Sequence, residues 1–208
     1  MISVAVKRLH QLAWQPGLWM LSSWWNSLEL TSCMTMYQNY PSTRKAIDRV
    51  IIARRQFPLQ PLPSKLDDVA TILLVNEARL EQLISAMGLI HLGNRDVLCL
   101  GHTRRILIAY LGRQMCDQLL AMHLPWGGRP HSMKLDLFEL LNAGCRWLLS
   151  CPHEHMQLIL NTLAIKLPPN ALSSTSNEAS KNDREHNLSH DLCEHEPFVL
   201  LHKLVRFL

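Results

Sequence analysis

Apolar residues recur at helical spacing through the middle of the chain, roughly residues 65–167, and this pattern restricts the fold more than any other feature. In "EARLEQLISAMGLIHLG" the residues of one stripe repeat at three and four positions: Leu80, Leu83, Ile84, Met87 and either Ile90 or His91. Such spacing places them on one face of a helix. Hardly any window alternates polar and apolar residues, as half-buried strands do. We therefore predict an all-α fold with a single compact multi-helix domain.

Changes in composition predict four segments along the chain. They are a Trp-rich N-terminal segment with a basic helix (1–57), a helical core domain (58–168), a flexible polar linker (169–189) and a C-terminal docking helix (190–208). The proline-rich stretch "FPLQPLPSKLDD" cannot continue a helix and indicates a stiff connector. Ser64 and Asp67 resemble a capping box, so we expect a helix over 65–75.

The overall composition favours a protein that works with partners in a cytosol. Of the 208 residues 48% are apolar, enough for a substantial core, and only 18% are charged, which leaves little surface charge. Six cysteines occur without a C-x-x-C pair, so we expect them to be reduced and mostly buried. Polar residues interrupt the N-terminal apolar stretch, and no run of about 18 apolar residues exists, so we expect neither a secretory signal nor a transmembrane helix.

The clearest basic helix is expected over residues 42–57, "STRKAIDRVIIARRQF". Its single acid is Asp48, against five cations: Arg44, Lys45, Arg49, Arg54 and Arg55. The face is either solvated or a contact to an acidic partner or a phosphate surface. One function hypothesis is therefore a helical nucleic-acid-binding regulator that uses residues 43–55.

Two apolar features are candidates for docking. Trp24 and Trp25 either cap the core as packed aromatics or anchor a docking face. Near the C-terminus, "EPFVLLHKLVRFL" places Phe198, Leu201 and Leu204 on a helical stripe. A segment this apolar should dock on its own domain or on a partner.

Motifs for catalysis or cofactor binding are absent from the sequence. It contains no P-loop, no G-x-G-x-x-G, no G-x-S-x-G nucleophile elbow and no H-E-x-x-H. We therefore predict that the protein is not an enzyme and binds no cofactor.

The stretch "EHNLSHDLCEHE" carries the residues most like metal ligands: His186, His190, Cys193 and His195. Structural zinc sites recruit ligands from two pieces of chain, whereas these lie on one short segment beside the linker. A closed site would need His153 or Cys151 to come across. We predict a solvated polar linker and no metal site, with a metal-stabilised module as the alternative.

Several pieces of the sequence carry a resemblance to a known family. A proline-rich entry is followed by "LEQLISAMGLIHLG", an "LPW" turn, "AGCRWLLS", "LNTLAIKLP" and a terminal "LHKLVRFL". In this order and spacing they resemble the SctK/YscK family of bacterial type III secretion systems. The resemblance covers about residues 58–168 and the last eight.

The resemblance implies a mostly helical, non-enzymatic adaptor in the sorting platform under the injectisome. It implies that the chain bridges the inner-membrane ring protein (SctD type) and the pod protein (SctQ type), and reaches SctL and the SctN ATPase indirectly. The expected location is the bacterial cytoplasm, peripherally at the inner membrane through the injectisome base. The expected partners are proteins, with no nucleic acid and no direct membrane insertion.

Overall fold

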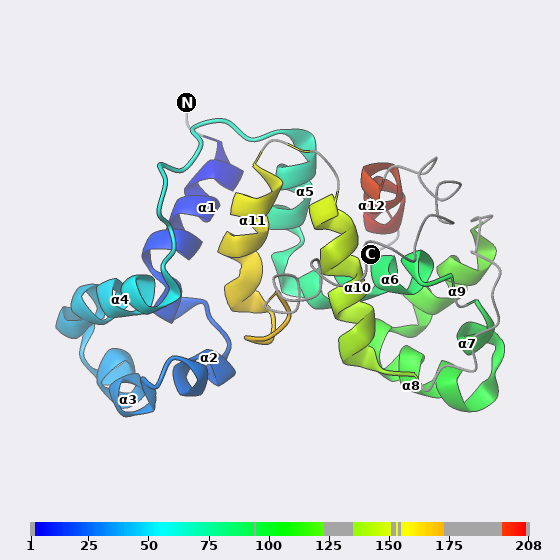
Figure 1. Cartoon of the computed structure of the whole chain (residues 1–208), viewed down its shortest axis with the longest axis horizontal. Helices are drawn as coiled ribbons and strands as arrows, with labels where there is room; N and C mark the ends of the chain where they lie inside the picture. Colours follow the sequence, from blue (N-terminus) through cyan, green and yellow to red (C-terminus); the bar gives the residue numbers. More distant parts are fainter. Residues whose placement is uncertain are drawn as a thin grey trace, which may run out of the picture. The chain divides into compact units, whose positions relative to one another are not determined.

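The computed structural model describes residues 3–93, 95–122, 135–150, 153, 155–172 and 197–206. These residues form helices joined by turns and short connectors, and no β-strand occurs among them (Figure 1). The predicted all-α fold is confirmed. None of the helices in this part of the chain is long and apolar enough to cross a membrane.

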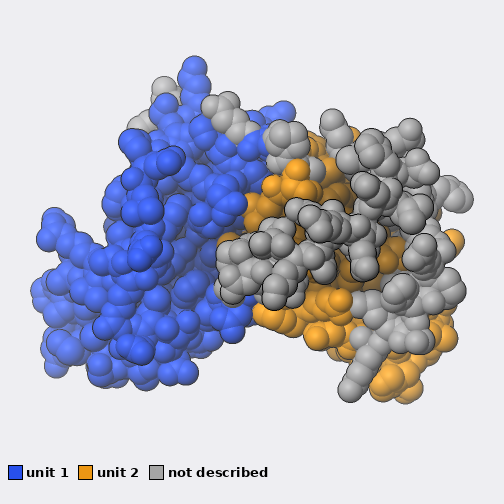
Figure 2. All heavy atoms as spheres, viewed as in Figure 1, with its two compact units in different colours: residues 1–78, 153–170 blue, residues 79–152, 171–208 orange. Residues whose placement is uncertain are grey.

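The chain folds into two compact units (Figure 2). Unit 1 consists of residues 1–78 and 153–170, and unit 2 of residues 79–152 and 171–208. The predicted segments divide the chain differently, because they follow local composition. The units follow long-range packing instead: a late helix, α11 (Met156–Leu163), returns to pack on helices near the N-terminus.

Unit 1 is built around its first helix, α1 (Val4–Trp14), which packs against α4, α5 and α11. The side chains of Leu9 and Leu12 in α1 are fully buried. The other elements of this unit, in chain order, are η1 (Pro16–Leu18), α2 (Ser22–Ser27), α3 (Thr31–Asn39), α4 (Pro41–Arg55), α5 (Asp68–Val75), α11 and η3 (Ala164–Lys166). The short 3-10 turn η2 (Glu77–Arg79) follows α5.

Side-chain caps fix where two of these helices begin. The Ser3 hydroxyl accepts a hydrogen bond from the Val6 N–H at 3.2 Å. The Asp67 carboxylate accepts one from the Ala70 N–H at 2.7 Å. The sequence prediction of a helix from residue 65 is therefore wrong at its start, because Asp67 itself is the N-cap and satisfies the first-turn donor.

Unit 2 is built around two closely crossed helices, α6 (Leu80–His91) and α10 (Leu137–Ser150). A glycine on each helix permits the close approach. A Cβ added to Gly88 would lie 1.8 Å from the Leu140 carbonyl oxygen, and one added to Gly144 would lie 2.0 Å from the Ile84 carbonyl oxygen. The remaining helices of this unit are α7 (Asp96–Cys99), α8 (Gly101–Leu111), α9 (Arg113–Ala121) and α12 (Pro197–Val205).

The C-terminal helix α12 packs on α6 within unit 2. Leu201 and Leu204 on this helix are fully buried, and Phe198 is half-buried. The apolar stripe foreseen from the sequence thus packs within its own unit.

Candidate interaction surface

Helix α4 carries the five cations that the sequence singles out, and the structure gives it two different faces. Ile47, Asp48 and Ile51 point into unit 1 and are buried. Residues 45–46, 49–50 and 53–54 are exposed. The spacing of three and four residues along each face is that of a helix lying on a core.

The buried acid of α4, Asp48, is held by donors from two other elements. Its carboxylate accepts hydrogen bonds from the Gly17 N–H at 3.0 Å and from the Tyr37 hydroxyl at 3.0 and 3.1 Å. Burial raises the pKa of Asp48 above its ordinary value, although the two donors oppose the shift. Burial and the nearby Asp48 also raise the pKa of Tyr37. This network ties η1 and α3 to α4.

Two of the five cations of α4 donate hydrogen bonds to backbone carbonyls of other elements in unit 1. Arg44 donates to the carbonyls of Tyr37 and Gln38 at 3.0 and 3.3 Å. Arg55 donates to the Asn161 carbonyl at 2.7 Å, and burial lowers the pKa of its guanidinium to about 10. Arg44 and Arg55 are therefore committed to contacts within the chain.

The predicted tryptophan anchors differ from each other. Trp25 is only 4% exposed and lies edge-on to Tyr37, with ring centroids 5.4 Å apart. Trp24 is half-buried, its indole N–H donates to the Leu167 carbonyl at 2.9 Å, and the Arg55 guanidinium lies 5.3 Å from its ring centre. Both side chains pack inside unit 1, as the alternative interpretation of aromatics capping a core expects.

Three predicted contact residues remain exposed on α4: Lys45, Arg49 and Arg54. The Arg54 guanidinium donates to the Leu28 carbonyl and lies 3.9 Å from the Glu29 carboxylate. Lys45 and Arg49 form no hydrogen bond or ion pair with other residues that the structure describes. Of the predicted candidates on α4, Lys45 and Arg49 are therefore available to a partner, whereas Arg54 is exposed but already contacts the turn at Leu28 and Glu29.

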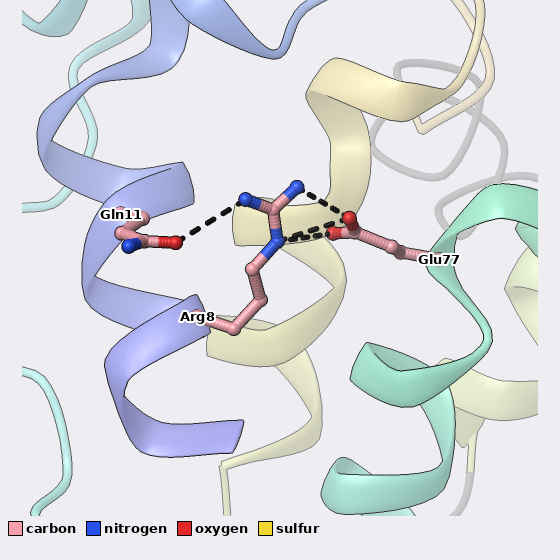
Figure 3. A network of polar contacts seen from close by, with 3 residues as sticks. All are labelled: Arg8, Gln11 and Glu77. Atoms are coloured by element: carbon pink, nitrogen blue, oxygen red, sulfur yellow. Dashed lines mark hydrogen bonds and ion pairs between the residues drawn. The ribbon is translucent and has the colours of Figure 1, made fainter. Parts of the chain in front are cut away.

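Sequence reasoning missed a polar network around Arg8 of α1. Figure 3 shows Arg8 of α1 between Gln11 and Glu77. The Arg8 Nε lies 2.9 and 3.0 Å from the two Glu77 carboxylate oxygens, and its Nη1 lies 3.3 Å from the Gln11 amide oxygen. The guanidinium also stacks 3.7 Å from the Trp19 ring centre. Arg8 and Glu77 are 69 residues apart, so no local pattern marks the pair.

The candidate metal ligands at the end of the predicted linker and just beyond it, His186, His190, Cys193 and His195, lie outside the described residues, as does Cys151. His153 lies in unit 1, with its Nε2 3.5 Å from an Asp67 carboxylate oxygen. Where the structure describes the chain, no three His, Cys, Asp or Glu side chains gather as a metal site would require.

In a comparison with known protein families, residues 7–169 match a family described as a type III secretion system subunit. Neither the curated proteins nor the solved structures give a match. The family match includes residues of both compact units and all of α4. The chain therefore belongs to this family of type III secretion system subunits.

Proposed function

We propose that the protein is a non-enzymatic adaptor of the injectisome sorting platform. In this role it bridges the inner-membrane ring protein (SctD type) and the pod protein (SctQ type), and through the latter reaches SctL and the SctN ATPase. It acts in the bacterial cytoplasm, held peripherally at the inner membrane by the injectisome base. The SctK/YscK resemblance of the sequence supports this specific role, beyond membership of the secretion-subunit family.

The observation that carries the proposal is the extent of the family match, residues 7–169, which runs through both compact units. A bridging protein needs at least two separate contact surfaces, and a chain with two units can offer one on each. Exposed cations on α4 of unit 1 supply one candidate surface.

The nucleic-acid alternative has less support. It relies on the five cations of the basic helix as phosphate contacts. Arg44 and Arg55 already donate to backbone carbonyls of the chain. A face with the three remaining cations is small for a dedicated nucleic-acid binder, which concentrates basic side chains along a stripe.

A clean gene deletion tests the adaptor role. We expect secretion of effectors to stop while the membrane rings still assemble, and a plasmid copy of the gene to restore secretion. The purified full-length protein should capture both the SctD-type and the SctQ-type protein. Normal secretion in the deletion strain contradicts the proposal.

A further inference from the structure

The exposed face of α4 has a defined layout. Its centre consists of small apolar residues spaced as along one side of a helix: Ala46, Val50 and Ala53. All three are exposed, and Val50 is 43% exposed although it is a large hydrophobic residue. Lys45 and Arg49 flank this centre on one side, and Arg54 flanks it on the other.

The positive charge on this face is compensated only at Arg54, which lies 3.9 Å from the Glu29 carboxylate, among the residues that the structure describes. The acid of α4, Asp48, is buried on the opposite side and is 4% exposed. Helices α2 and α3, "SSWWNS" and "TSCMTMYQN", contain no charged residue. In the first 57 residues there are seven Lys or Arg and only two acids, Asp48 and Glu29. The field over the α4 face is therefore positive.

We propose that this face docks an acidic amphipathic helix of another component of the secretion apparatus. The inference rests on the proposed adaptor function and deepens it by naming the surface and the chemistry of the partner. Small central residues let a second helix approach to an interaxial distance of about 8 Å. Lys45 and Arg49, along one edge of such a contact, pair with acids at the flanking positions of the partner helix, and so help to set its identity and direction.

The composition of the face argues against two other occupants. Helices that lie in a membrane surface present Trp, Phe or Leu between their cations, whereas the centre here is Ala and Val. A phosphate backbone is bound through hydrogen bonds from charged and polar side chains. An apolar centre adds nothing to such binding. Charge and packing together favour a protein helix.

Binding measurements with the full-length protein test the proposal. The probes are the purified pod protein and the cytosolic domain of the ring protein from the same system. The test variant is K45E/R49E, and its matched control is K7E/K65E, which makes the same charge change at two other exposed sites of unit 1. We expect K45E/R49E to weaken binding of one probe about tenfold or more, and K7E/K65E to leave it within about twofold.

A second variant separates packing from charge attraction. V50R adds a cation to the face but places a long side chain where the partner helix must approach. A docked acidic helix predicts weaker binding by V50R, about tenfold, whereas attraction to phosphate predicts tighter binding. A DNA duplex and phosphatidylglycerol vesicles serve as probes for those alternatives. Unchanged melting temperatures and far-UV circular dichroism show that each variant is folded.

Each outcome decides the inference. Loss of one probe with both K45E/R49E and V50R, and not with the control, supports it. If the wild-type protein binds a probe and both variants bind it equally well, the adaptor function stands and the α4 inference is overturned. If V50R binds DNA or vesicles more tightly and loses neither protein probe, the face is a phosphate surface and the inference is wrong. If the wild-type protein binds neither protein probe, the adaptor function fails first, and this inference fails with it.

Discussion

Long polar and aromatic side chains link the helices of unit 1, whereas two glycines bring the central helices of unit 2 into backbone contact. In unit 1 Arg8 joins α1 to Glu77 and stacks on Trp19. In unit 2 the carbonyl oxygens of Leu140 and Ile84 occupy the space that a side chain at Gly88 or Gly144 would need. Both solutions place helices side by side, but they respond to substitution in different ways.

This difference predicts where each unit tolerates amino-acid substitutions. A contact between backbones has no flexible atoms that can move aside. Unit 2 should therefore tolerate no larger residue where α6 and α10 cross. Contacts through long side chains can rearrange, and each contributes modestly. Unit 1 also holds the exposed cations of α4.

The largest effect is expected at the glycine crossing. Gly88→Ala and Gly144→Ala each force backbone atoms of α6 and α10 apart, and we expect each to lower the free energy of unfolding by about 3 kcal/mol or more. Urea denaturation followed by circular dichroism measures this. Gly101→Ala is the control, because a Cβ there meets nothing within 4 Å. We expect that variant to change stability by less than about 1 kcal/mol. A mild effect at both Gly88 and Gly144 would show that the crossing can open cheaply.

The next effect comes from the ion pair of unit 1. The side chains of Arg8 and Glu77 are 18% and 17% exposed, so Glu77→Gln leaves a largely buried guanidinium without its carboxylate. We expect a loss of about 2 kcal/mol in unfolding free energy. The comparison pair in unit 2 is Arg104 and Asp117, 2.7 Å apart with side chains 33% and 50% exposed. Asp117→Asn should cost about 0.5 kcal/mol or less.

A double-mutant cycle checks that the loss belongs to the pair. Arg8→Gln combined with Glu77→Gln should cost less than the sum of the single changes, because neither charge is left alone. Additive losses would mean that Arg8 acts mainly by stacking on Trp19, which lies 3.7 Å from the guanidinium carbon.

Much of the helical content could be predicted from the sequence, because periodicity is a local signal. Leu83, Ile84 and Met87 are all fully buried in α6, as their spacing predicts. The basic helix, expected over 42–57, runs from Pro41 to Arg55 and ends where Gln56 adopts a left-handed conformation with φ of 52°.

The division into units, and the contacts that Arg44 and Arg55 make within the chain, were not predictable in this way. Arg44 and Arg55 look like surface residues by type, but Arg55 is bound to the carbonyl of Asn161, 106 residues away. Gly144 falls within an apolar stripe of α10, and only the neighbouring helix shows why a glycine stands there. The sequence predicts which face of a helix is buried but not which distant segment covers it. In the same way, it predicts the cations of α4 but not which of them contact other parts of the chain.

A smaller effect is expected at Trp24, a polar link within unit 1. Trp24→Phe removes the indole N–H that donates to the Leu167 carbonyl at 2.9 Å and weakens the contact with Arg55. We expect a loss of about 1 kcal/mol in unfolding free energy. Trp14→Phe is the matched control, since Trp14 is 49% exposed, and it should change stability by less than about 0.5 kcal/mol. Equal losses in the two variants would show that the Trp24 hydrogen bond contributes nothing measurable.

The smallest expected effect is a component of the pH dependence that comes from Asp48 in unit 1. Because burial raises its pKa in the folded protein, the folded state holds the Asp48 proton more tightly than the unfolded state does. This contribution to stability is complete below the unfolded value near 3.8 and is lost as the pH rises through the higher folded pKa. Asp48→Asn keeps an acceptor for the Gly17 N–H and removes the titration. As the pH rises from about 3.8 through the folded pKa of Asp48, the wild type should therefore lose stability relative to the Asp48→Asn variant. A constant difference would mean that the Gly17 and Tyr37 donors fully offset the cost of burying the carboxylate.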